Sequence, residues 1–352
     1  MNILINGKSY SLQKYKPLSD SFTDRVISFC QNWLTGQDEF EINTSGSTGT
    51  PKKIIIKREA IKQSAAATSQ ALDLKNGETS LVCLDPNYIG GMMMLVRSLE
   101  VGMNILAEEP STNPFASLPT NTKIDFIALV PYQLKEILQS ENKRYFNQIK
   151  NILIGGAPLD LVTQKELQIY KSQFYETYGM TETISHVALK KINGENPSAY
   201  FKCLNGITIR QDDRACLCIR APYLLDEIIT NDVVELKSLD EFIWLGRFDN
   251  VINSGGVKIF PESTEKKIES IFSELKFQKR FFIAGLPDQK LGEAVTLVIE
   301  FHLDADKITE LMKKLRLNLH KYEMPKSIKM VDKFIEASNS KINRKKTLEL
   351  LM

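Results

Sequence analysis

The chain has 352 residues, a net charge of +2 and 43% hydrophobic residues. This length allows one large hydrophobic core and a smaller one, so we expect two domains. Acidic and basic residues are interspersed, which argues against a nucleic-acid-binding protein. The most apolar stretch, residues 88–102, is short and contains Arg97 and Glu100, and the N-terminus has no signal-peptide pattern. The sequence therefore predicts no membrane span and a cytoplasmic location.

The stretch NTSGSTGTPKKIII, residues 43–56, combines small hydroxyl residues, glycines and lysines. Such a loop can bind phosphate through backbone N–H groups, hydroxyls and lysine side chains. It is not the P-loop of kinases and GTPases, because Pro51 occupies the position of the second glycine and a β-branched, strand-like run follows Lys53. We expect a phosphate-binding loop between two strands, and a surface turn without a ligand is the alternative when the loop is considered alone.

Short apolar runs alternate with amphipathic stretches between residues 79 and 178. Strands are predicted at 79–84, 103–108, 124–130, 149–155 and 173–179, and helices at 90–99, 132–138 and 159–170. This order predicts an α/β fold in which helices pack on layered β-sheets.

Between residues 199 and 247 the pattern changes to short strands separated by turns. Strands are predicted at 200–204, 207–211, 215–221, 233–237 and 241–247. They indicate a small antiparallel β subdomain, a sheet or barrel attached to the larger core.

Gly, Asp and Asn residues cluster at 246–256, and a helix start follows, with Pro261 at an early helical position. The remaining chain predicts strands at 280–286, 294–301 and 325–331 and a basic helix at 306–320, which together form a small α+β unit. The predicted domains are therefore residues 1–248 and a C-terminal lid of residues 249–352, joined by a hinge.

The cysteines and histidines match no metal site. The cysteines are Cys30, Cys83, Cys203, Cys216 and Cys218, in apolar or strand-like contexts. Structural zinc needs about four ligands, and nothing completes a set beside Cys216 and Cys218, so we expect reduced, buried thiols. The histidines, His186, His302 and His320, are far apart in sequence and are expected to be structural or exposed.

Several segments resemble motifs of the adenylate-forming superfamily, which includes acyl- and aryl-CoA synthetases, adenylation domains and luciferases. These segments are TSGSTGTPKK (44–53), GGAPL (155–159), YGMTET (178–183), TND (230–232), GRFDNVINSGGVKI (246–259) and SNSKINRKK (338–346). One such match is weak, whereas this series, in the family's order from Thr44 to Arg344, is specific.

The resemblance implies an ATP site built from most of these motifs. It assigns ATP contacts to Thr44, Ser45, Gly46, Ser47, Thr48, Gly49, Lys52, Gly155, Gly156, Ala157, Tyr178, Gly179, Asp232 and Arg247. Within this set the Tyr178 ring would stack on adenine, and Asp232 and Arg247 would bind the ribose. Thr181 would reach a phosphate and Glu182 would ligate Mg²⁺. Asn231 stands where the family has glycine.

The resemblance also implies roles for the C-terminal unit. Lys341 would be the catalytic lysine, a point charge that can pair with carboxylate and phosphate oxygens, although Ser340 stands where the family has glycine. Asp249 would be the pivot of the hinge. The candidate CoA contacts are Gly255, Gly256 and Lys258. Without the motif, Lys341 would be interpreted as one more solvated lysine.

The phosphate loop begins early for this superfamily, and the chain is similar in this respect to short o-succinylbenzoate–CoA ligases of menaquinone biosynthesis. Arg97 falls where those ligases carry an arginine near the benzoate group, and a guanidinium suits a second carboxylate. A surface salt bridge with Glu100 is the alternative. Tyr88 or Ile89 occupies the place of a family histidine. The candidate substrate contacts are Tyr88, Arg97 and Gly156. Met92, Met93 and Met94 either shape an adaptable pocket or pack in the core.

The resemblance implies an acid–thiol ligase that uses ATP, Mg²⁺ and the co-substrate CoA, and o-succinylbenzoate is the expected acid. Another aryl- or acyl-CoA synthetase, and an enzyme that loads a carrier protein, are the alternatives. A non-catalytic nucleotide-binding protein is a more distant one, because Lys341 and Glu182 are retained. The sequence does not define an oligomeric state.

Overall fold

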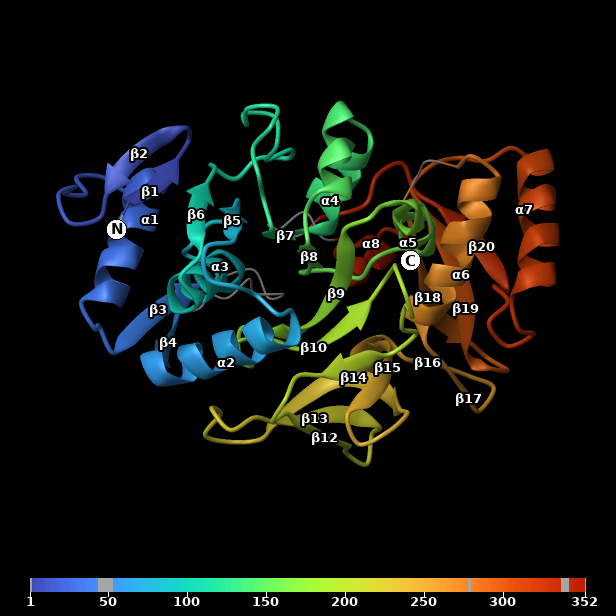
Figure 1. Ribbon diagram of the computed structural model, residues 1–352. Coiled ribbons are helices and arrows are strands. Elements are labelled where there is room, and N and C mark those ends of the chain that lie inside the picture. Colours follow the sequence, from blue (N-terminus) through green and yellow to red (C-terminus); the bar gives the residue numbers. More distant parts are fainter. Residues whose placement is uncertain (1, 44–52, 278–279, 337–341, 352) are drawn as a thin grey trace.

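The computed structural model describes residues 2–43, 53–277, 280–336 and 342–351. A large mixed sheet flanked by helices forms most of the molecule, and a smaller unit with its own sheet stands beside it (Figure 1). This arrangement confirms the predicted α/β class. Within the described ranges, none of the helices has the length and apolar character needed to cross a membrane.

The centre of the large sheet is parallel. Its strands, in spatial order, are β9 (Gln173–Met180), β8 (Asn151–Ile154), β7 (Phe126–Leu129), β5 (Thr79–Val82), β6 (Asn104–Ala107) and β1 (Asn2–Ile5), and β2 (Lys8–Ser11) pairs antiparallel with β1 at the edge. All four residues of β8 are buried, as expected for a parallel strand covered on both faces.

Helices cover both faces of this parallel centre. One face carries α1 (Phe22–Leu34), α2 (Arg58–Ala71) and α3 (Ile89–Val101), and the other carries α4 (Pro131–Leu138) and α5 (Leu161–Glu166). The end of α3 is set by Gly102, whose φ of +79° suits a left-handed helix cap. The predicted helix at 159–170 is shorter than expected, because a 3₁₀ turn, η2 (Leu167–Ile169), follows α5 and buries Leu167.

The antiparallel strands continue the same sheet. Their spatial order is β10 (Ser185–Lys191), β11 (Phe201–Cys203), β15 (Glu241–Arg247), β14 (Ile228–Leu236), β13 (Cys216–Arg220) and β12 (Thr208–Gln211). The strands predicted after residue 199 are confirmed. They do not form an independent sheet, however, because β10 pairs with β9 on one side and with β11 on the other.

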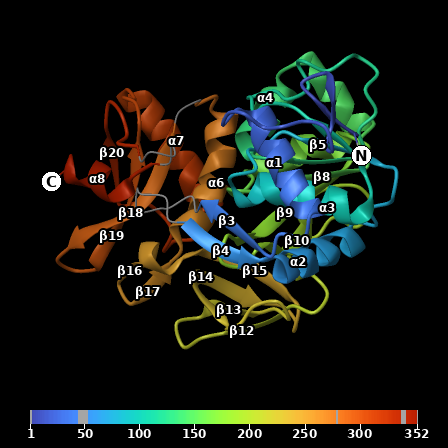
Figure 2. The same ribbon diagram turned by 90° about the vertical axis from the view of Figure 1, so that its left-hand side faces the viewer.

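A separate hairpin carries the predicted phosphate loop. Strands β3 (Glu39–Asn43) and β4 (Lys53–Lys57) pair antiparallel, with Asn43 opposite Lys53, and lie next to α2 (Figure 2). The loop therefore runs between two strands, as predicted. Residues 44–52 themselves, including Thr44 to Gly49 and Lys52, lie outside the described residues.

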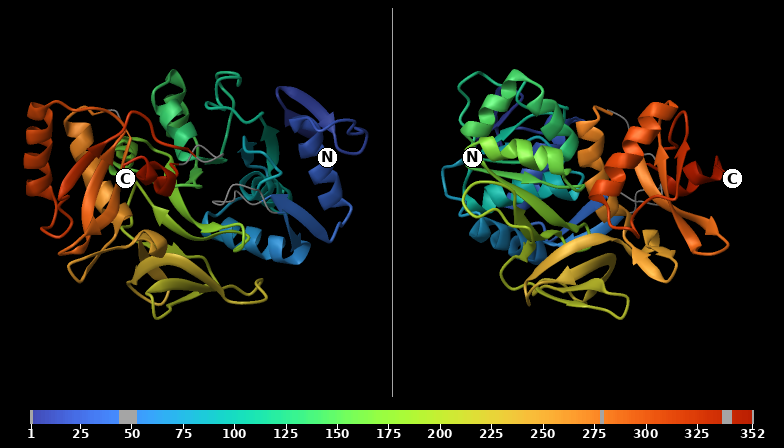
Figure 3. Two further views of the ribbon diagram at one scale, coloured as in Figure 1. Left: turned by 180° about the vertical axis from the view of Figure 1, so that it is seen from behind. Right: turned by 90° about the vertical axis from the view of Figure 1, so that its right-hand side faces the viewer.

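The C-terminal unit has its own core. Its sheet contains β16 (Ile252–Ser254), β17 (Val257–Ile259), β18 (Phe281–Asp288), β19 (Gly292–Ile299) and β20 (Ser327–Met330), and its helices are α6 (Pro261–Glu274), α7 (Ala305–Asn318) and α8 (Arg344–Glu349). Pro261 occupies the first turn of α6, as predicted. The unit lies at one side of the large sheet in both views of Figure 3. The predicted boundary after residue 248 falls in the turn η3 (Phe248–Asn250), and the division into two moving domains stays a prediction.

Candidate active site

The residues predicted to bind the ribose lie together on adjacent strands. Asp232 and Arg247 face each other across β14 and β15. The Tyr178 hydroxyl donates to Asp232 Oδ2 at 2.7 Å, and Arg247 Nη1 lies 3.6 Å from Asp232 Oδ1. Burial, helped by the Asp232 carboxylate, raises the pKa of Tyr178, so its hydroxyl stays a donor. The structure therefore brings three predicted ATP contacts into one cluster.

This cluster continues to the predicted hinge residue. Arg247 Nη2 lies 3.4 Å from Asp249 Oδ2, and Asn231 Nδ2 donates to the same oxygen at 3.4 Å. Asn231 Oδ1 in turn accepts from Arg214 Nη1 at 2.9 Å. The asparagine that replaces the family's glycine thus connects β14 with the turn that leads to the C-terminal unit.

The turn between β9 and β10 carries Thr181 and Glu182. Packing requires a glycine at position 179, because a Cβ there would lie 2.3 Å from the Ser185 carbonyl oxygen of the adjacent strand. Thr183 stabilises the turn by accepting from the Met180 N–H at 2.9 Å and donating to the Ser185 carbonyl at 2.7 Å. Thr181 is nearly buried and Glu182 is exposed.

The side chains of Thr181 and Glu182 make no hydrogen bond or ion pair with the part of the chain that the structure describes. Within that part, no group of three or more His, Cys, Asp or Glu residues is arranged to hold a metal ion. Nucleotide enzymes hold Mg²⁺ with one or two carboxylates and with substrate phosphates. The unpaired carboxylate of Glu182 fits such a site.

The GGAPL segment lies beside the YGMTET motif. A Cβ on Gly155 would come within 2.6 Å of Thr177 Oγ1, and Gly156 has a φ of +90°, which favours glycine. The Leu159 N–H donates to Glu176 Oε1 at 3.1 Å, and Glu176 forms a buried ion pair with Lys190. The GGAPL segment is therefore held beside β9, the strand that carries Tyr178.

Arg344, from the described end of the SNSKINRKK motif, faces Pro158 and Leu159 of the GGAPL segment across a cavity of about 250 Å³. The cavity is lined by Pro158, Leu159, Asp160 and Trp244 on one side and by Glu262, Glu265, Lys266, Glu269 and Arg344 on the other. Arg344 donates to Glu265 Oε2 at 2.9 Å, which fixes this end of the motif on α6. Lys341, three residues earlier in the chain, lies outside the described residues.

The candidate CoA residues lie elsewhere. Gly255, Gly256 and Lys258 belong to the β16–β17 hairpin, and the Gly255 N–H donates to the Leu291 carbonyl of the same unit at 2.8 Å. Neither of the two cavities found between α6 and the large domain is lined by these three residues. The structure does not bring the hairpin to the face where Arg344 meets the GGAPL segment.

Arg97 is buried inside α3, with 2% of its surface exposed. Its Nη2 donates to Ser185 Oγ at 3.0 Å, whereas its buried Nε has no partner. In the described ranges no carboxylate lies within ion-pair distance of Arg97. Burial lowers the pKa of Arg97 to about 9. Among the described residues, this guanidinium is therefore a buried charge without a counter-charge.

The alternative salt bridge between Arg97 and Glu100 is wrong. Glu100 Oε1 accepts from Trp33 Nε1 at 2.8 Å, and Glu100 Oε2 lies 3.6 Å from Lys62 Nζ. The neighbouring Met92, Met93 and Met94 are fully buried in core contacts, so they pack as core residues.

Polar residues that the sequence did not single out surround Arg97. Ser185 and His186 come from β10 and Thr68 comes from α2, which packs on β10. The buried Tyr223 hydroxyl also lies near this group: burial raises the pKa of Tyr223, and Ser64 and the charge of Arg97 partly offset the effect. No local pattern marks these residues, because they meet only when β10 runs back along β9.

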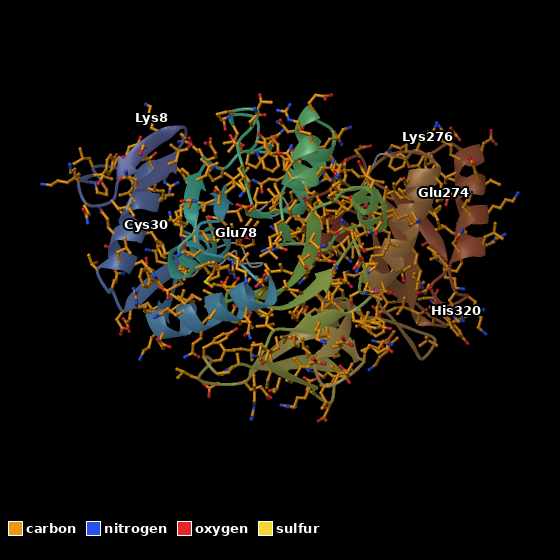
Figure 4. All side chains as sticks on the ribbon, in the orientation of Figure 1. Lys8, Cys30, Glu78, Glu274, Lys276 and His320 are labelled. Atoms are coloured by element: carbon orange, nitrogen blue, oxygen red, sulfur yellow. The ribbon has the colours of Figure 1, made fainter. Side chains whose placement is uncertain are left out.

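The remaining histidines and the cysteines are as predicted. His302 and His320 are exposed, and His320 lies at the outer edge of the C-terminal unit (Figure 4). The five cysteines are buried and unpaired.

Tyr88 precedes α3 at the opposite end from Arg97. It is 45% exposed and bridges to Asn43, the last residue of β3, so it lies beside the start of the predicted phosphate loop. Arg97 follows nine residues later, which is about 13 Å along a helix. Of the three candidate substrate residues, Tyr88 and Arg97 therefore lie at different ends of α3.

Comparisons with known proteins agree on one family. A family model described as AMP-binding enzyme matches residues 40–210. The 2-succinylbenzoate–CoA ligase of Listeria monocytogenes serotype 4b is 26% identical, over 96% of this chain and 78% of its own length. The crystal structure of an acyl-CoA synthetase (AMP-forming)/AMP-acid ligase II-like protein from Dyadobacter fermentans is 37% identical, with 97% of both chains covered and a TM-score of 0.64.

The o-succinylbenzoate coenzyme A synthetase of Bacillus subtilis, solved with ATP and magnesium ion, has a TM-score of 0.70 at 20% identity, with 88% of this chain and 69% of that chain covered. At this identity the likeness shows the fold. The 37% identity to the Dyadobacter protein over nearly the whole of both chains shows the family. This chain belongs to the AMP-binding enzymes of the adenylate-forming superfamily, as an AMP-forming acid–CoA ligase.

Proposed function

We propose that this ligase converts o-succinylbenzoate to o-succinylbenzoyl-CoA, with Arg97 binding the benzoate carboxylate. The observation that carries the proposal is the buried guanidinium, which has no counter-charge in the part of the chain that the structure describes. An unpaired buried charge is costly, and such groups are normally paired or ligand-binding. A carboxylate on the substrate would supply the missing partner in a bidentate geometry.

The proposed reaction has two steps. An oxygen of the succinyl carboxylate attacks the α-phosphorus of ATP, the bond to the bridging oxygen breaks, and pyrophosphate leaves. The CoA sulfur then attacks the acyl carbon, its proton is lost, and AMP leaves. In the first step bound Mg²⁺ would neutralise phosphate charge.

The residues of this chain would divide the remaining work. Asp232 and Arg247 hold the ribose, and Lys341 balances the charge that develops on the phosphate and carboxylate oxygens. Thr181 and Glu182 lie on one turn. The Thr181 hydroxyl would bind a phosphate of ATP, and the Glu182 carboxylate would ligate Mg²⁺ beside it. Gly255, Gly256 and Lys258 would reach CoA after a movement of the C-terminal unit about Asp249.

Two of the relatives support this acid. The Listeria ligase is named for 2-succinylbenzoate, and the Bacillus synthetase for o-succinylbenzoate. The rivals are a ligase for another aryl or acyl acid, and an enzyme that loads the thiol of a carrier protein. A rival that acts on an acid with a single carboxylate has no need of a buried cation.

Pyrophosphate release with ATP, CoA and a panel of acids tests the proposal. We expect strong turnover with o-succinylbenzoate and weak turnover with 4-oxo-4-phenylbutanoate, which lacks the ring carboxylate. Equal turnover of the two acids, or a strict need for a carrier protein, would contradict the proposal.

Replacing Lys341 by alanine tests the mechanism. Loss of one charge-stabilising group should lower the adenylation rate by about 10²–10³-fold. The thioester step from a supplied acyl-adenylate should change little. Lys345→Ala is the matched control, because Lys345 is an exposed lysine of the same segment. Similar adenylation rates in both variants would refute the role of Lys341.

A further inference from the structure

A chain of hydrogen bonds connects the buried arginine to a different helix. Arg97 Nη2 donates to Ser185 Oγ at 3.0 Å, and Ser185 Oγ lies 3.5 Å from His186 Nδ1, at the outer limit of a hydrogen bond. Across the imidazole ring, His186 Nε2 lies 2.9 Å from Thr68 Oγ1. Thr68 donates to the Ser64 carbonyl at 3.3 Å, one turn earlier in α2. The path therefore runs from α3 through β10 to α2.

The direction of each bond depends on where the single hydroxyl proton of Thr68 lies. Directed at the Ser64 carbonyl, that proton leaves Thr68 as an acceptor, and His186 Nε2 is then the donor to Thr68. A neutral imidazole that is protonated at Nε2 leaves Nδ1 as an acceptor for the Ser185 hydroxyl. Burial, helped by the charge of Arg97, lowers the pKa of His186 and keeps the ring neutral. Ser185 then presents lone pairs to Arg97.

The backbone at this point is strained. Ile184 and Ser185 have φ angles of +52° and +81°, in a region that residues with side chains rarely adopt. Residues in this conformation persist only where their surroundings hold them in place. The Ser64 hydroxyl donates to the Ile184 carbonyl at 2.6 Å, and Thr183 donates to the Ser185 carbonyl at 2.7 Å. The surroundings thus hold Ser185 in the conformation that brings its hydroxyl to Arg97.

We propose that His186 and Thr68 are positioning residues for an acid substrate with a second carboxylate. They orient the Ser185 hydroxyl, which occupies one N–H of Arg97 and leaves the buried, unpartnered Nε for a carboxylate of the substrate. This inference rests on the proposed function and adds the residues that set its specificity. Neither His186 nor Thr68 touches the substrate, since their effect passes through Ser185 and Arg97.

Thr68→Val and Thr68→Ser form a matched pair that tests this proposal. Valine keeps the shape of Thr68 and removes the hydroxyl, whereas serine keeps the hydroxyl. The measured quantity is the ratio of kcat/KM for o-succinylbenzoate to kcat/KM for 4-oxo-4-phenylbutanoate. We expect Thr68→Val to lower this ratio about tenfold, mainly through the KM of the diacid, because one hydrogen bond of the path is lost. Thr68→Ser should restore it.

The two outcomes of this experiment separate the inference from the function. If the wild-type enzyme does not prefer the diacid, the proposed function fails and the inference fails with it. If the wild-type enzyme prefers the diacid and Thr68→Val keeps the full preference, only the inference is overturned. A merely structural role of Thr68 would lower the melting temperature of Thr68→Val and leave the ratio unchanged.

Nitrogen NMR of the imidazole rings gives a readout that does not depend on activity. The chain has three histidines, so the His186 signals can be assigned with His186→Gln. We expect a neutral ring at pH 7 that is protonated at Nε2, with the chemical shift of Nδ1 typical of an acceptor. A ring protonated at Nδ1, or a charged ring at pH 7, would overturn the proposed path.

Discussion

Two charged clusters of the large domain differ in whether their charges are balanced. In the strand cluster, Asp232 contacts both Tyr178 and Arg247, and Arg247 also contacts Asp249. In the helix cluster, Arg97 has one neutral partner, Ser185, and an unpartnered Nε. The strand cluster is complete as the chain folds, whereas the helix cluster lacks an anion.

This difference indicates how each cluster would meet a ligand. A ribose is neutral, and it can add hydrogen bonds to a carboxylate whose charge is already paired. An anion is needed where a guanidinium has been buried without one, because the folded chain bears the desolvation cost until the ligand arrives. Changes to the helix cluster should therefore alter acid selection, and changes to the strand cluster should alter nucleotide binding.

The largest effect is expected from Arg97→Met, which removes the unbalanced charge and keeps much of the side-chain volume. Loss of a buried charge pair with the substrate should lower kcat/KM for o-succinylbenzoate by about 100-fold or more, as measured by pyrophosphate release. The free energy of unfolding should not fall, because removing an uncompensated buried ion is often neutral or stabilising.

Arg58→Met is the control for this change. The Arg58 guanidinium lies 4.1 Å from the Trp33 ring centroid and donates to the Trp33 carbonyl, so its contacts are complete. The Arg58→Met variant should have a lower free energy of unfolding than the wild type and should keep the preference for the diacid. An Arg97→Met enzyme that still prefers the diacid would remove the contrast between the clusters.

Asp232→Asn should have an intermediate effect, since it keeps the size of the side chain and removes the charge that pairs with Arg247. We expect the KM for ATP to rise about tenfold, with no change in the preference among acids. Asp226→Asn, an exposed carboxylate that precedes β14, is the control. A shift in acid preference with an unchanged KM for ATP would show that the clusters are not separate in function.

The smallest effect is expected at Glu269, whose charge lies between the two units. It lines both cavities beside α6, and burial, with a further contribution from Asp160, raises its pKa to about 7. The folded chain therefore binds a proton more readily than the unfolded chain, whose glutamate has a pKa of about 4.5. Stability should decrease as the pH rises between these two values.

Glu269→Gln removes this dependence. At pH 8 the variant should be more stable than the wild type, by an amount on the order of 1 kcal/mol after solvent screening. Near pH 4.5 the two should be alike, as measured by thermal unfolding across this range. Glu274→Gln is the control on the same helix, and Glu274 is labelled in Figure 4. Its hydrogen bond with Lys314 lowers the pKa of Glu274. If the stability of the wild type and of Glu269→Gln depends on pH in the same way, the carboxyl group of Glu269 is solvated and its pKa is not raised.

Elements with strong local signals were predictable from the sequence. The apolar run of β8, the glycine that ends α3 and the proline that begins α6 each act within a few residues. The order of the motifs was enough to indicate the adenylate-forming family. The strand β10 was not predicted, and neither was the continuity of the large sheet that it creates.

The sequence by itself determined the α/β class, the family and the set of candidate residues, because periodicity and motif order are properties of neighbouring positions. Only the tertiary structure decided that Arg97 is buried away from Glu100, and that Ser185, His186 and Thr68 meet beside it. Burial and hydrogen bonding between α2, α3 and β10 depend on how distant segments pack. A positional pattern contains no information on the charge balance that this packing creates.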